Sequence, residues 1–299
     1  ASAFSTPLML IYNKSLDEGA LPRTWLDANV TPIFKKGSRF DAANYRPISL
    51  TSVPCKIMEK IIRARIMAHL DSNKLISKNQ HGFVPKKACV TNLLETMDMI
   101  TGTIGNNKQR YKGKMKWLEL IFLDFAKAFD KVSHRRLLHK LASYGITGQI
   151  LRWISAFLTD RRQRVVMGDE CSEWEAVTSG VPQGSVLGPI LFVIFINDLS
   201  EVTSNDFKMY ADDSKIIAVI NEKTQAEDTA RLQADLDRVV SWTDTWLMKL
   251  NIDKCKVMHI GHMNPLHDYK MTDETTQKQK AHTLMTTAVD RDLGVMISK

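Results

Sequence analysis

The sequence predicts an α+β fold, because helical and strand-like apolar patterns occur together along its 299 residues. Apolar residues recur at helical spacing over residues 54–70, which predicts an amphipathic helix. A continuous apolar run at residues 118–123 predicts a buried strand. Two apolar runs at Phe207–Tyr210 and Ser214–Ala218 predict a β-hairpin. Together these patterns are typical of helices packed on one face of a largely antiparallel sheet.

The remaining elements are placed by the same patterns and by the glycines and polar turns between them. We expect helices at 134–143 and 148–158, hairpin strands at Arg164–Met167 and Glu175–Thr178 around a Gly168–Asp169 turn, a buried helix at Val186–Ile196, a helix whose apolar stripe runs from Leu232 to Leu250, and a strand at Lys256–Ile260. On the 54–70 helix, Glu59 is expected on the polar face with its basic neighbours. Residues 263–288 are polar and lack periodicity, so little regular structure is expected there.

Composition is that of an ordinary globular protein, with 44% hydrophobic and 25% charged residues, which excludes the disordered and fibrous classes. The net charge of +8 is unevenly distributed. Residues 1–123 carry 19 Lys and Arg against 9 Asp and Glu, whereas residues 124–299 carry 22 against 24. A basic first part favours contact with a phosphate backbone, because Lys and Arg release counterions from nucleic acid. The alternative is a solvated basic surface.

The four cysteines indicate reduced thiols of an intracellular protein, because they form no Cys-x-x-Cys pair. They are Cys55, Cys89, Cys171 and Cys255. Cys255 also lies near three histidines, His259, His262 and His267, but this spacing matches no common zinc module. We interpret the group as an incidental polar strand end.

Targeting and membrane signals are not visible in the sequence. The first residues lack a basic segment followed by an apolar core, and the apolar stretch Val186–Ile196 is too short to span a bilayer. No membrane partner is therefore expected. Because the chain opens on Ala1, we expect it to be a piece of a longer polyprotein.

Three acidic residues indicate two-metal chemistry. Asp212 and Asp213 follow Tyr210 between the two runs of the predicted hairpin, and Asp124 closes the apolar run at 118–123. Converging carboxylates can hold two divalent cations about 3.5–4 Å apart, which activate a 3′-hydroxyl and stabilise leaving pyrophosphate. The alternative is structural, since Asp is common in turns and at strand ends.

Six short motifs follow one another in a fixed order along the chain. They are Asn44–Leu50 (NYRPISL), Leu123–Asp130 (LDFAKAFD), Gly180–Ser185 (GVPQGS), Tyr210–Asp213 (YADD), Leu250–Cys255 (LNIDKC) and Asp292–Val295 (DLGV). In this order they resemble the reverse transcriptase domain of non-LTR retrotransposons of the jockey-like LINE class. The resemblance runs along nearly the whole chain, although each motif alone is weak.

The resemblance implies a right-hand polymerase with fingers and palm. The fingers would comprise about residues 1–115 and part of 135–205, the palm about 116–299 with interleaved segments, and the thumb would be largely absent. The implied activity is RNA-directed DNA polymerisation with dNTPs, an RNA template, a DNA primer or nicked target DNA, and two Mg²⁺ ions, with Mn²⁺ as an alternative. The implied location is intracellular, nuclear or cytoplasmic. The oligomeric state is not predicted.

The resemblance also assigns roles to individual residues. Asp124, Asp212 and Asp213 are the expected metal ligands, since Mg²⁺ prefers oxygen ligands, and Lys254 is the expected partner of the leaving pyrophosphate. The expected nucleotide-binding residues are Arg46, Phe129, Pro182, Gln183, Gly184 and Tyr210. The expected template and primer contacts are Lys35, Lys36, Leu293 and Gly294.

Phe129 carries the expectation of sugar selection. An aromatic ring beneath the sugar would clash with a ribose 2′-hydroxyl, so DNA is the expected product, although core aromatics are the commoner role of Phe. Asp130, next to it, is expected to have a structural or capping role. Two other functions stay open: a catalytically inactive nucleic-acid-binding remnant of such an element, and an RNA-templated RNA polymerase.

Overall fold

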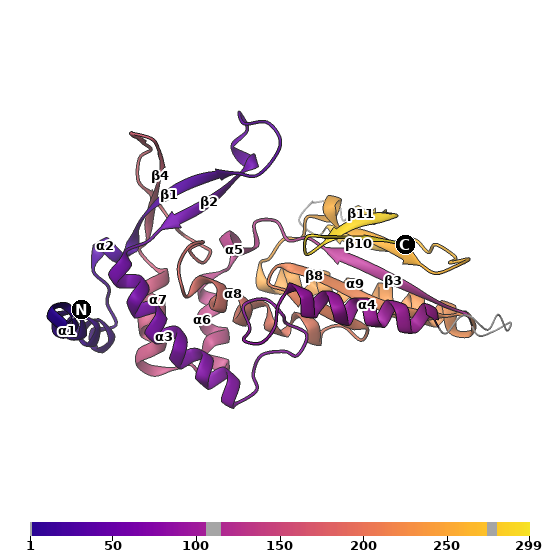
Figure 1. The fold of residues 1–299 in the computed structure, drawn as a ribbon, viewed down its shortest axis with the longest axis horizontal. Helices are drawn as coiled ribbons and strands as arrows, with labels where there is room; N and C mark the ends of the chain where they lie inside the picture. The colour runs from indigo at the N-terminus through magenta and orange to yellow at the C-terminus, as the bar shows by residue number, and fades with distance from the viewer. Residues whose placement is uncertain (1, 106–114, 274–279) are drawn as a thin grey trace. The chain divides into compact units, whose positions relative to one another are not determined.

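The computed structural model describes residues 2–105, 115–273 and 280–299 and confirms the α+β fold class (Figure 1). The chain divides into two compact units. Unit 1 comprises residues 1–76 and 129–195, and unit 2 comprises residues 77–128 and 196–299. The assignment of fingers and palm to these units stays a prediction. Among the described residues, no helix combines the length and apolar character that crossing a membrane requires.

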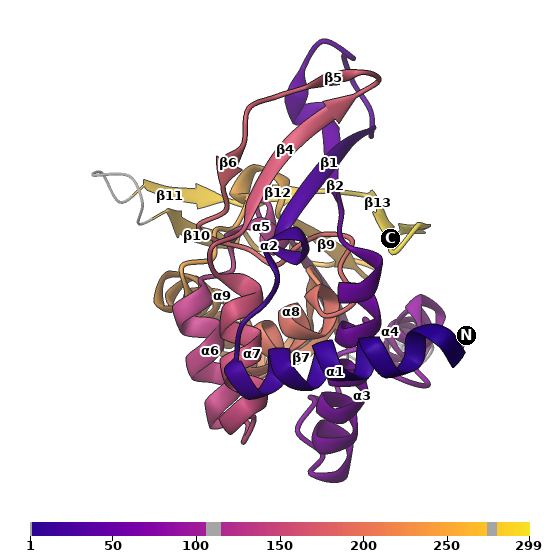
Figure 2. The same ribbon diagram turned by 90° about the vertical axis from the view of Figure 1, so that its left-hand side faces the viewer.

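Unit 1 consists of a small sheet and a group of helices (Figure 2). Its elements are α1 (Ser2–Glu18), α2 (Arg23–Leu26), β1 (Asp27–Phe34), the 3₁₀ turn η1 (Ala42–Asn44), β2 (Tyr45–Leu50), α3 (Val53–Ser72), α5 (Ala128–Lys131), α6 (His134–Ser143), α7 (Gly148–Leu158), β4 (Arg162–Met167), β5 (Glu170–Cys171), β6 (Glu175–Ala176) and α8 (Gly188–Ile196). Strand β1 pairs antiparallel with β2 and parallel with β4.

The predicted hairpin around Gly168–Asp169 is correct in its turn but wrong in its second strand. Strand β4 turns there into β5, where Met167 pairs with Glu170. The expected strand Glu175–Thr178 is shortened to β6, which pairs with the beginning of β4. A two-residue turn joins the nearest residues directly, so β5 takes the place next to the turn.

The helices of unit 1 enclose an apolar core. The prediction of a buried helix at Val186–Ile196 is confirmed, since residues 190–196 of α8 are completely buried. The predicted amphipathic helix is α3, whose buried stripe includes Met58, Ile62 and Leu70. A helix that is apolar all round is stable only when other elements surround it, which agrees with the complete burial of residues 190–196.

Glu59 of α3 corrects the sequence analysis, because it is completely buried rather than on the polar face. Its Oε2 accepts hydrogen bonds from the backbone N–H groups of Val186 (2.6 Å) and Leu187 (2.9 Å). Burial raises the pKa of Glu59, and these two hydrogen bonds oppose that shift. The carboxylate therefore satisfies N–H groups at the start of α8 that have no partner within the helix.

Unit 2 is built on a five-stranded sheet in the order β12-β9-β3-β8-β7. The elements of this unit are α4 (Cys89–Gly105), β3 (Lys116–Leu123), the 3₁₀ turn η3 (Asn197–Glu201), β7 (Asp206–Tyr210), β8 (Asp213–Asn221), the 3₁₀ turn η4 (Glu222–Thr224), α9 (Gln225–Trp246), the 3₁₀ turn η5 (Ile252–Lys254), β9 (Lys256–Ile260), β10 (Lys270–Asp273), β11 (Lys280–Thr283), β12 (Met285–Thr286), β13 (Val289–Asp292) and β14 (Val295–Ser298).

Strand β3 is the central strand of this sheet and is buried along most of its length. It pairs antiparallel with both β8 and β9. Ile100 of α4, which runs alongside β3 in Figure 1, packs with Leu118 and Leu120 on one face. Burial on both faces explains the continuous apolar run that predicted this strand.

Helix α9 ends earlier than predicted. Its last residue is Trp246, and Leu247 adopts a left-handed conformation with φ of +55°. Leu250 therefore lies beyond the helix, where it forms an isolated bridge with Phe125. No glycine or proline stands at this point, so the sequence contains no usual signal for the helix end.

The expectation of little regular structure over residues 263–288 is wrong for the described residues of that stretch. Strands β10 and β11 pair antiparallel there, and β12 joins the main sheet. Tyr269 and Met271 are buried, and β10 packs against α9. Residues 274–279 lie outside the described part of the chain.

The β13–β14 hairpin is fixed to strand β8 by a buried ion pair. Lys215 of β8 pairs with Asp292 at the end of β13, and their side chains are 3% and 7% exposed. Burial lowers the pKa of Lys215, and the Asp292 carboxylate opposes this shift. A second pair joins Lys256 of β9 to Asp290 of β13 at 3.1 Å.

We predict that Asp292→Asn destabilises the protein by about 3–5 kcal/mol, because it leaves the buried Lys215 ammonium without its carboxylate. Urea unfolding followed by circular dichroism measures the change. The matched control replaces both partners, Lys215→Met with Asp292→Leu, and should lose much less stability. An unchanged unfolding midpoint for Asp292→Asn would contradict the importance of this pair.

Candidate active site

The strand register of unit 2 brings the predicted acidic residues to one end of the sheet. The last pair between β3 and β8 joins Leu123 to Ser214, and directly opposed residues in antiparallel strands have Cα atoms about 5 Å apart. Asp124 follows Leu123, and Asp213 precedes Ser214. Asp124 and Asp213 are therefore the two residues next to the last pair of this register.

The twin acids lie at a two-residue hairpin turn. Tyr210 pairs with Asp213, which leaves Ala211 and Asp212 as the turn residues. Ala211 is buried and has φ of +55°, a conformation that is unusual for a residue with a side chain. Asp212 is half-buried and Asp213 is exposed. Tyr210 forms a side-chain hydrogen bond with Cys89 of α4, which raises the pKa of its phenol.

Asp124 is held by backbone contacts to the segment after α9. Its carbonyl oxygen accepts a hydrogen bond from Asn251 N (2.7 Å). Lys254 Nζ lies 3.9 Å from Asp124 Oδ1, and both side chains are substantially exposed, 64% and 42%. An exposed pair at this distance contributes little stability, but it places a cation beside the first acid.

The donor chemistry of these residues suits magnesium, because all three side chains offer carboxylate oxygens that are not fully buried. Within the described ranges, however, no group of three or more His, Cys, Asp or Glu side chains is gathered closely enough to hold a metal ion. The structure thus places Asp124 and the twin acids at neighbouring strand ends without a closed coordination site.

In unit 1, the predicted nucleotide-binding loop Pro182–Gly184 is held against β2. Ser49 N donates to the carbonyl oxygen of Gln183 (2.7 Å). Gly184 has φ of +114°, and a Cβ there would collide with Ser49 O, so glycine is required at this position. Gln183 Nε2 donates to Asp130 Oδ1 (2.9 Å), which orients the Gln183 amide. Asp130 thus has the expected structural role, through Gln183.

Phe129 is half-buried and stacks on Phe192 of α8, with ring centroids 4.2 Å apart and planes at 16°. Its carbonyl oxygen accepts a hydrogen bond from Val181 N (2.8 Å). These contacts fix the position of the ring within unit 1. They are compatible with both sequence interpretations, a core aromatic and a sugar-selecting ring.

The predicted basic contacts lie on the hairpin of β1 and β2. Arg46 is exposed on β2 opposite Ile33, and Lys35 and Lys36 are exposed just after β1. Lys35 N donates to Asn44 O (2.8 Å), which closes the hairpin. The three cations therefore share one small element of unit 1.

The predicted primer contacts Leu293 and Gly294 form the turn of the β13–β14 hairpin in unit 2. Both have positive φ, +47° and +92°, and Asp292 pairs with Val295 across the turn. The buried pair of Lys215 with Asp292 joins this turn to β8, the strand that begins at Asp213.

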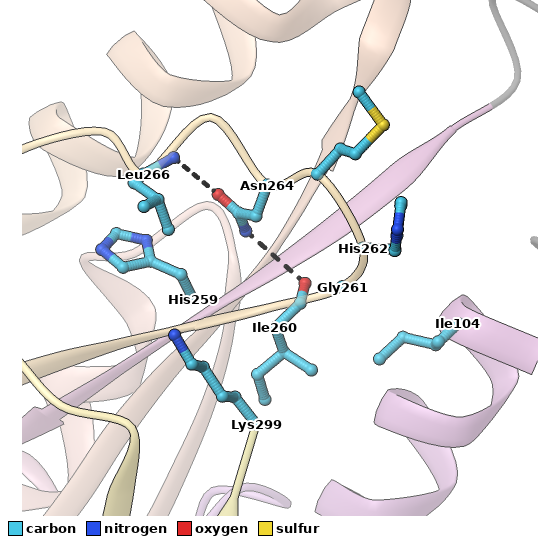
Figure 3. Close-up of a pocket in the computed structure, with 9 residues that line it drawn as sticks. Ile104, His259, Ile260, Gly261, His262, Asn264, Leu266 and Lys299 are labelled. Atoms are coloured by element: carbon cyan, nitrogen blue, oxygen red, sulfur yellow. Dashed lines mark hydrogen bonds between the residues drawn. The ribbon is translucent and has the colours of Figure 1, made fainter.

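An open pocket of about 490 Å³ in unit 2 contains none of the predicted site residues (Figure 3). It is lined by residues 259–264 and by Ile104, Leu266 and Lys299. Ile260, which lines the pocket, pairs with Leu118 of β3. Leu118 precedes Asp124 by six residues, so the pocket lies roughly 20 Å from Asp124 along the strand direction.

The histidine cluster near Cys255 is divided between separate contacts. His259 Nδ1 lies 2.5 Å from Glu119 Oε2 in a buried pair, His262 lines the open pocket, and His267 Nε2 contacts Gln225. Burial raises the pKa of the Cys255 thiol to about 11.

Comparison with known proteins identifies the fold family. A family model described as "Reverse transcriptase (RNA-dependent DNA polymerase)" matches residues 33–287. The chain belongs to this reverse transcriptase family. The reverse transcriptase domain is 33% identical over 257 residues to the "RNA-directed DNA polymerase from mobile element jockey" of Drosophila melanogaster, covering 83% of this chain and 27% of that relative.

Other relatives give the same family and the same partial coverage. The domain is 31% identical over 265 residues to the "Probable RNA-directed DNA polymerase from transposon BS" of Drosophila melanogaster, again spanning 27% of that relative. Among solved structures, apo telomerase from Candida tropicalis matches with a TM-score of 0.55 and 12% identity, over 99% of this chain and 60% of that chain. This likeness confirms the right-hand polymerase fold.

Sequence reasoning missed polar residues that hold the loops of the reverse transcriptase domain. Glu59 supports the start of α8, Gln80 contacts the Tyr210–Asp213 turn, and His134 Nε2 lies 2.7 Å from the carbonyl oxygen of Gly180. Their partners are distant in sequence, so no local pattern marks them.

We predict that stability falls as the pH decreases below about 6.5 and that His134 contributes to this fall. Burial lowers the pKa of His134 below its usual 6.5, and its hydrogen bond to Gly180 O only partly opposes the shift. The unfolded chain therefore binds the proton first, so the contribution is intact above pH 6.5 and is lost as the pH falls towards the folded-state pKa.

Urea midpoints at pH 5.5 and 7.5 test this, with His134→Gln expected to reduce the difference between them. His139→Gln, on the exposed face of the same helix, is the matched control. Equal pH dependence in His134→Gln and the unmodified protein would contradict the prediction.

Proposed function

We propose that this domain is an RNA-directed DNA polymerase, which extends a primer 3′-hydroxyl with dNTPs on an RNA template. The observation that carries the proposal is the register of β3 with β8, whose last pair joins Leu123, the residue before Asp124, to Ser214, the residue after Asp213. Family membership and relatives named as RNA-directed DNA polymerases support it. DNA primers or nicked target DNA, and an intracellular site of action, belong to the same proposal.

Asp124, Asp212 and Asp213 would hold two Mg²⁺ ions, or Mn²⁺ in their place. When bound, such ions activate the 3′-hydroxyl and offset the charge that develops on the transferred phosphoryl group. Lys254, beside Asp124, supplies a positive charge for the leaving pyrophosphate. Tyr210 anchors the first strand of the turn through Cys89.

The residues of unit 1 would select and orient the incoming nucleotide. Arg46 offers a guanidinium that binds phosphate oxygens in a fixed geometry, with Lys35 and Lys36 on the same hairpin for template or triphosphate. The Pro182–Gly184 loop would offer the nucleotide its backbone groups and the side-chain amide of Gln183, which Asp130 orients. Leu293 and Gly294 of unit 2 would contact the primer.

A catalytically inactive nucleic-acid-binding remnant is the second candidate function. One observation favours it: the described carboxylates do not form a group gathered to hold a metal ion. The two candidates differ in turnover, so primer extension separates them.

We predict Mg²⁺-dependent incorporation of dTTP on poly(rA) primed with oligo(dT). Asp212→Asn should lower the rate by on the order of 10³-fold or more without unfolding the protein, because it removes a ligand of the reacting centre. Asp206→Asn, an exposed acid on the same hairpin, is the matched control and should retain activity. Incorporation that is absent, or equal in Asp212→Asn, would favour the remnant.

We predict that Phe129→Ala raises ribonucleotide incorporation relative to deoxynucleotide incorporation by about 10-fold, because the ring no longer excludes the 2′-hydroxyl. The ratio of rUTP to dTTP incorporation on the same template measures this. Phe129→Tyr keeps the ring and its stack on Phe192 and should keep the ratio. An unchanged ratio in a folded Phe129→Ala protein would identify Phe129 as a core aromatic only.

A further inference from the structure

A short segment before α4 extends the sheet of unit 2 along the free edge of β7. His81 N donates to Met209 O (2.8 Å), and Met209 N donates to Asn79 O (2.9 Å), so Gln80 faces Met209 in a parallel bridge. Asn92 of α4 also donates to Met209 O through its Nδ2 (3.2 Å). The segment therefore ends directly beside the Tyr210–Asp213 turn.

The side chain of Gln80 reaches into this turn and is completely buried. Its Oε1 accepts two backbone hydrogen bonds, from Gly82 N (2.7 Å) and from Ala211 N (3.0 Å). Two N–H groups directed at one atom require the oxygen there, which fixes the orientation of the amide. Gln80 Nε2 has no hydrogen-bond partner among the described residues, so Gln80 contacts the turn through Oε1.

Ala211 needs this acceptor for two reasons. In a two-residue hairpin turn the N–H of the first turn residue has no partner in the strand ladder, and a buried N–H without a partner is costly. Ala211 also has φ of +55°, where its Cβ is crowded, and such a conformation persists only when the surroundings impose it.

Gly82 supports the same turn through its close backbone packing. A Cβ at this position would collide with Ala211 N and would lie 2.9 Å from the carbonyl carbon of Tyr210. The backbone at Gly82 thus packs directly on the turn, and only glycine permits this approach.

We propose that Gln80 is a positioning residue for the catalytic turn: its Oε1 holds Ala211 in the left-handed conformation and so directs the Asp212 carboxylate. This role rests on the proposed polymerase function. It concerns the geometry of the turn, and it therefore acts on the chemical step more than on nucleotide binding.

Backbone amide exchange on the unmodified 299-residue chain gives a test that needs no activity. The Ala211 amide should exchange at least about 100-fold more slowly than an unstructured amide, because it is buried and hydrogen-bonded. Exchange at the unstructured rate would overturn the proposal. In Gln80→Met, which keeps the length but lacks the acceptor, this amide should exchange at least about 10-fold faster than in the unmodified chain.

Steady-state primer extension gives the second readout. Gln80→Met should lower kcat about 10-fold, the value of one lost hydrogen bond, with less than about a 3-fold change in KM for dTTP. Gln80→Glu retains an acceptor oxygen and should recover most of kcat. If Gln80 had a purely structural role, kcat and KM would both change and the melting temperature would fall with them. Equal activity of Gln80→Met and Gln80→Glu would overturn the proposal.

Gly82→Ala provides an independent variant, should Gln80→Met fail to fold. The added methyl displaces the turn and should lower kcat by at least about 10-fold. Gly102→Ala in α4, where a Cβ meets nothing within 4 Å, is the matched control. If the unmodified chain shows no polymerisation, the proposed function fails, whereas the Ala211 exchange rate still decides the role of Gln80.

Discussion

The pairing register of β3 with β8 is the constraint on which the candidate site depends. Asp124 and the Tyr210–Asp213 turn come from distant parts of the chain, and they lie at the same end of the sheet because Leu123 pairs with Ser214. A slip of one residue would turn every side chain of β3 to the opposite face. Because both faces of this strand are buried, such a slip would change the packing of β3 on both faces.

Within each unit, polar side chains fix the loops that carry the candidate chemistry. Glu59 accepts a hydrogen bond from Val186 N at the start of α8, and Gln80 accepts one from Ala211 N. Asp130 accepts one from the Gln183 side-chain amide and so orients it. Glu59 and Gln80 are completely buried and accept backbone N–H groups that would otherwise lack partners, and in a low-dielectric interior such unpaired groups are costly. The rigidity of these loops thus comes from a few specific acceptors within each unit.

The sequence was sufficient for elements with a strong apolar pattern and for residues next to them. The α3 stripe, the all-apolar α8 and the central β3 were predictable because burial determines their composition. The end of α9 at Leu247 was not, since a left-handed leucine has no local signature. Strands β10 and β11 were missed because they are short and polar, and Glu59 and Gln80 because their partners are remote.

The central place of β3 also determines when the sheet can be completed during synthesis. Both neighbours of β3 lie downstream, so the ribosome delivers this apolar strand long before β8 and β9 exist to cover its two edges. Unpaired strand edges promote aggregation, and pairing over long sequence separations is slow. The nascent polypeptide must therefore pass through a stage in which β3 is vulnerable, and this stage ends only after Ile260 has emerged.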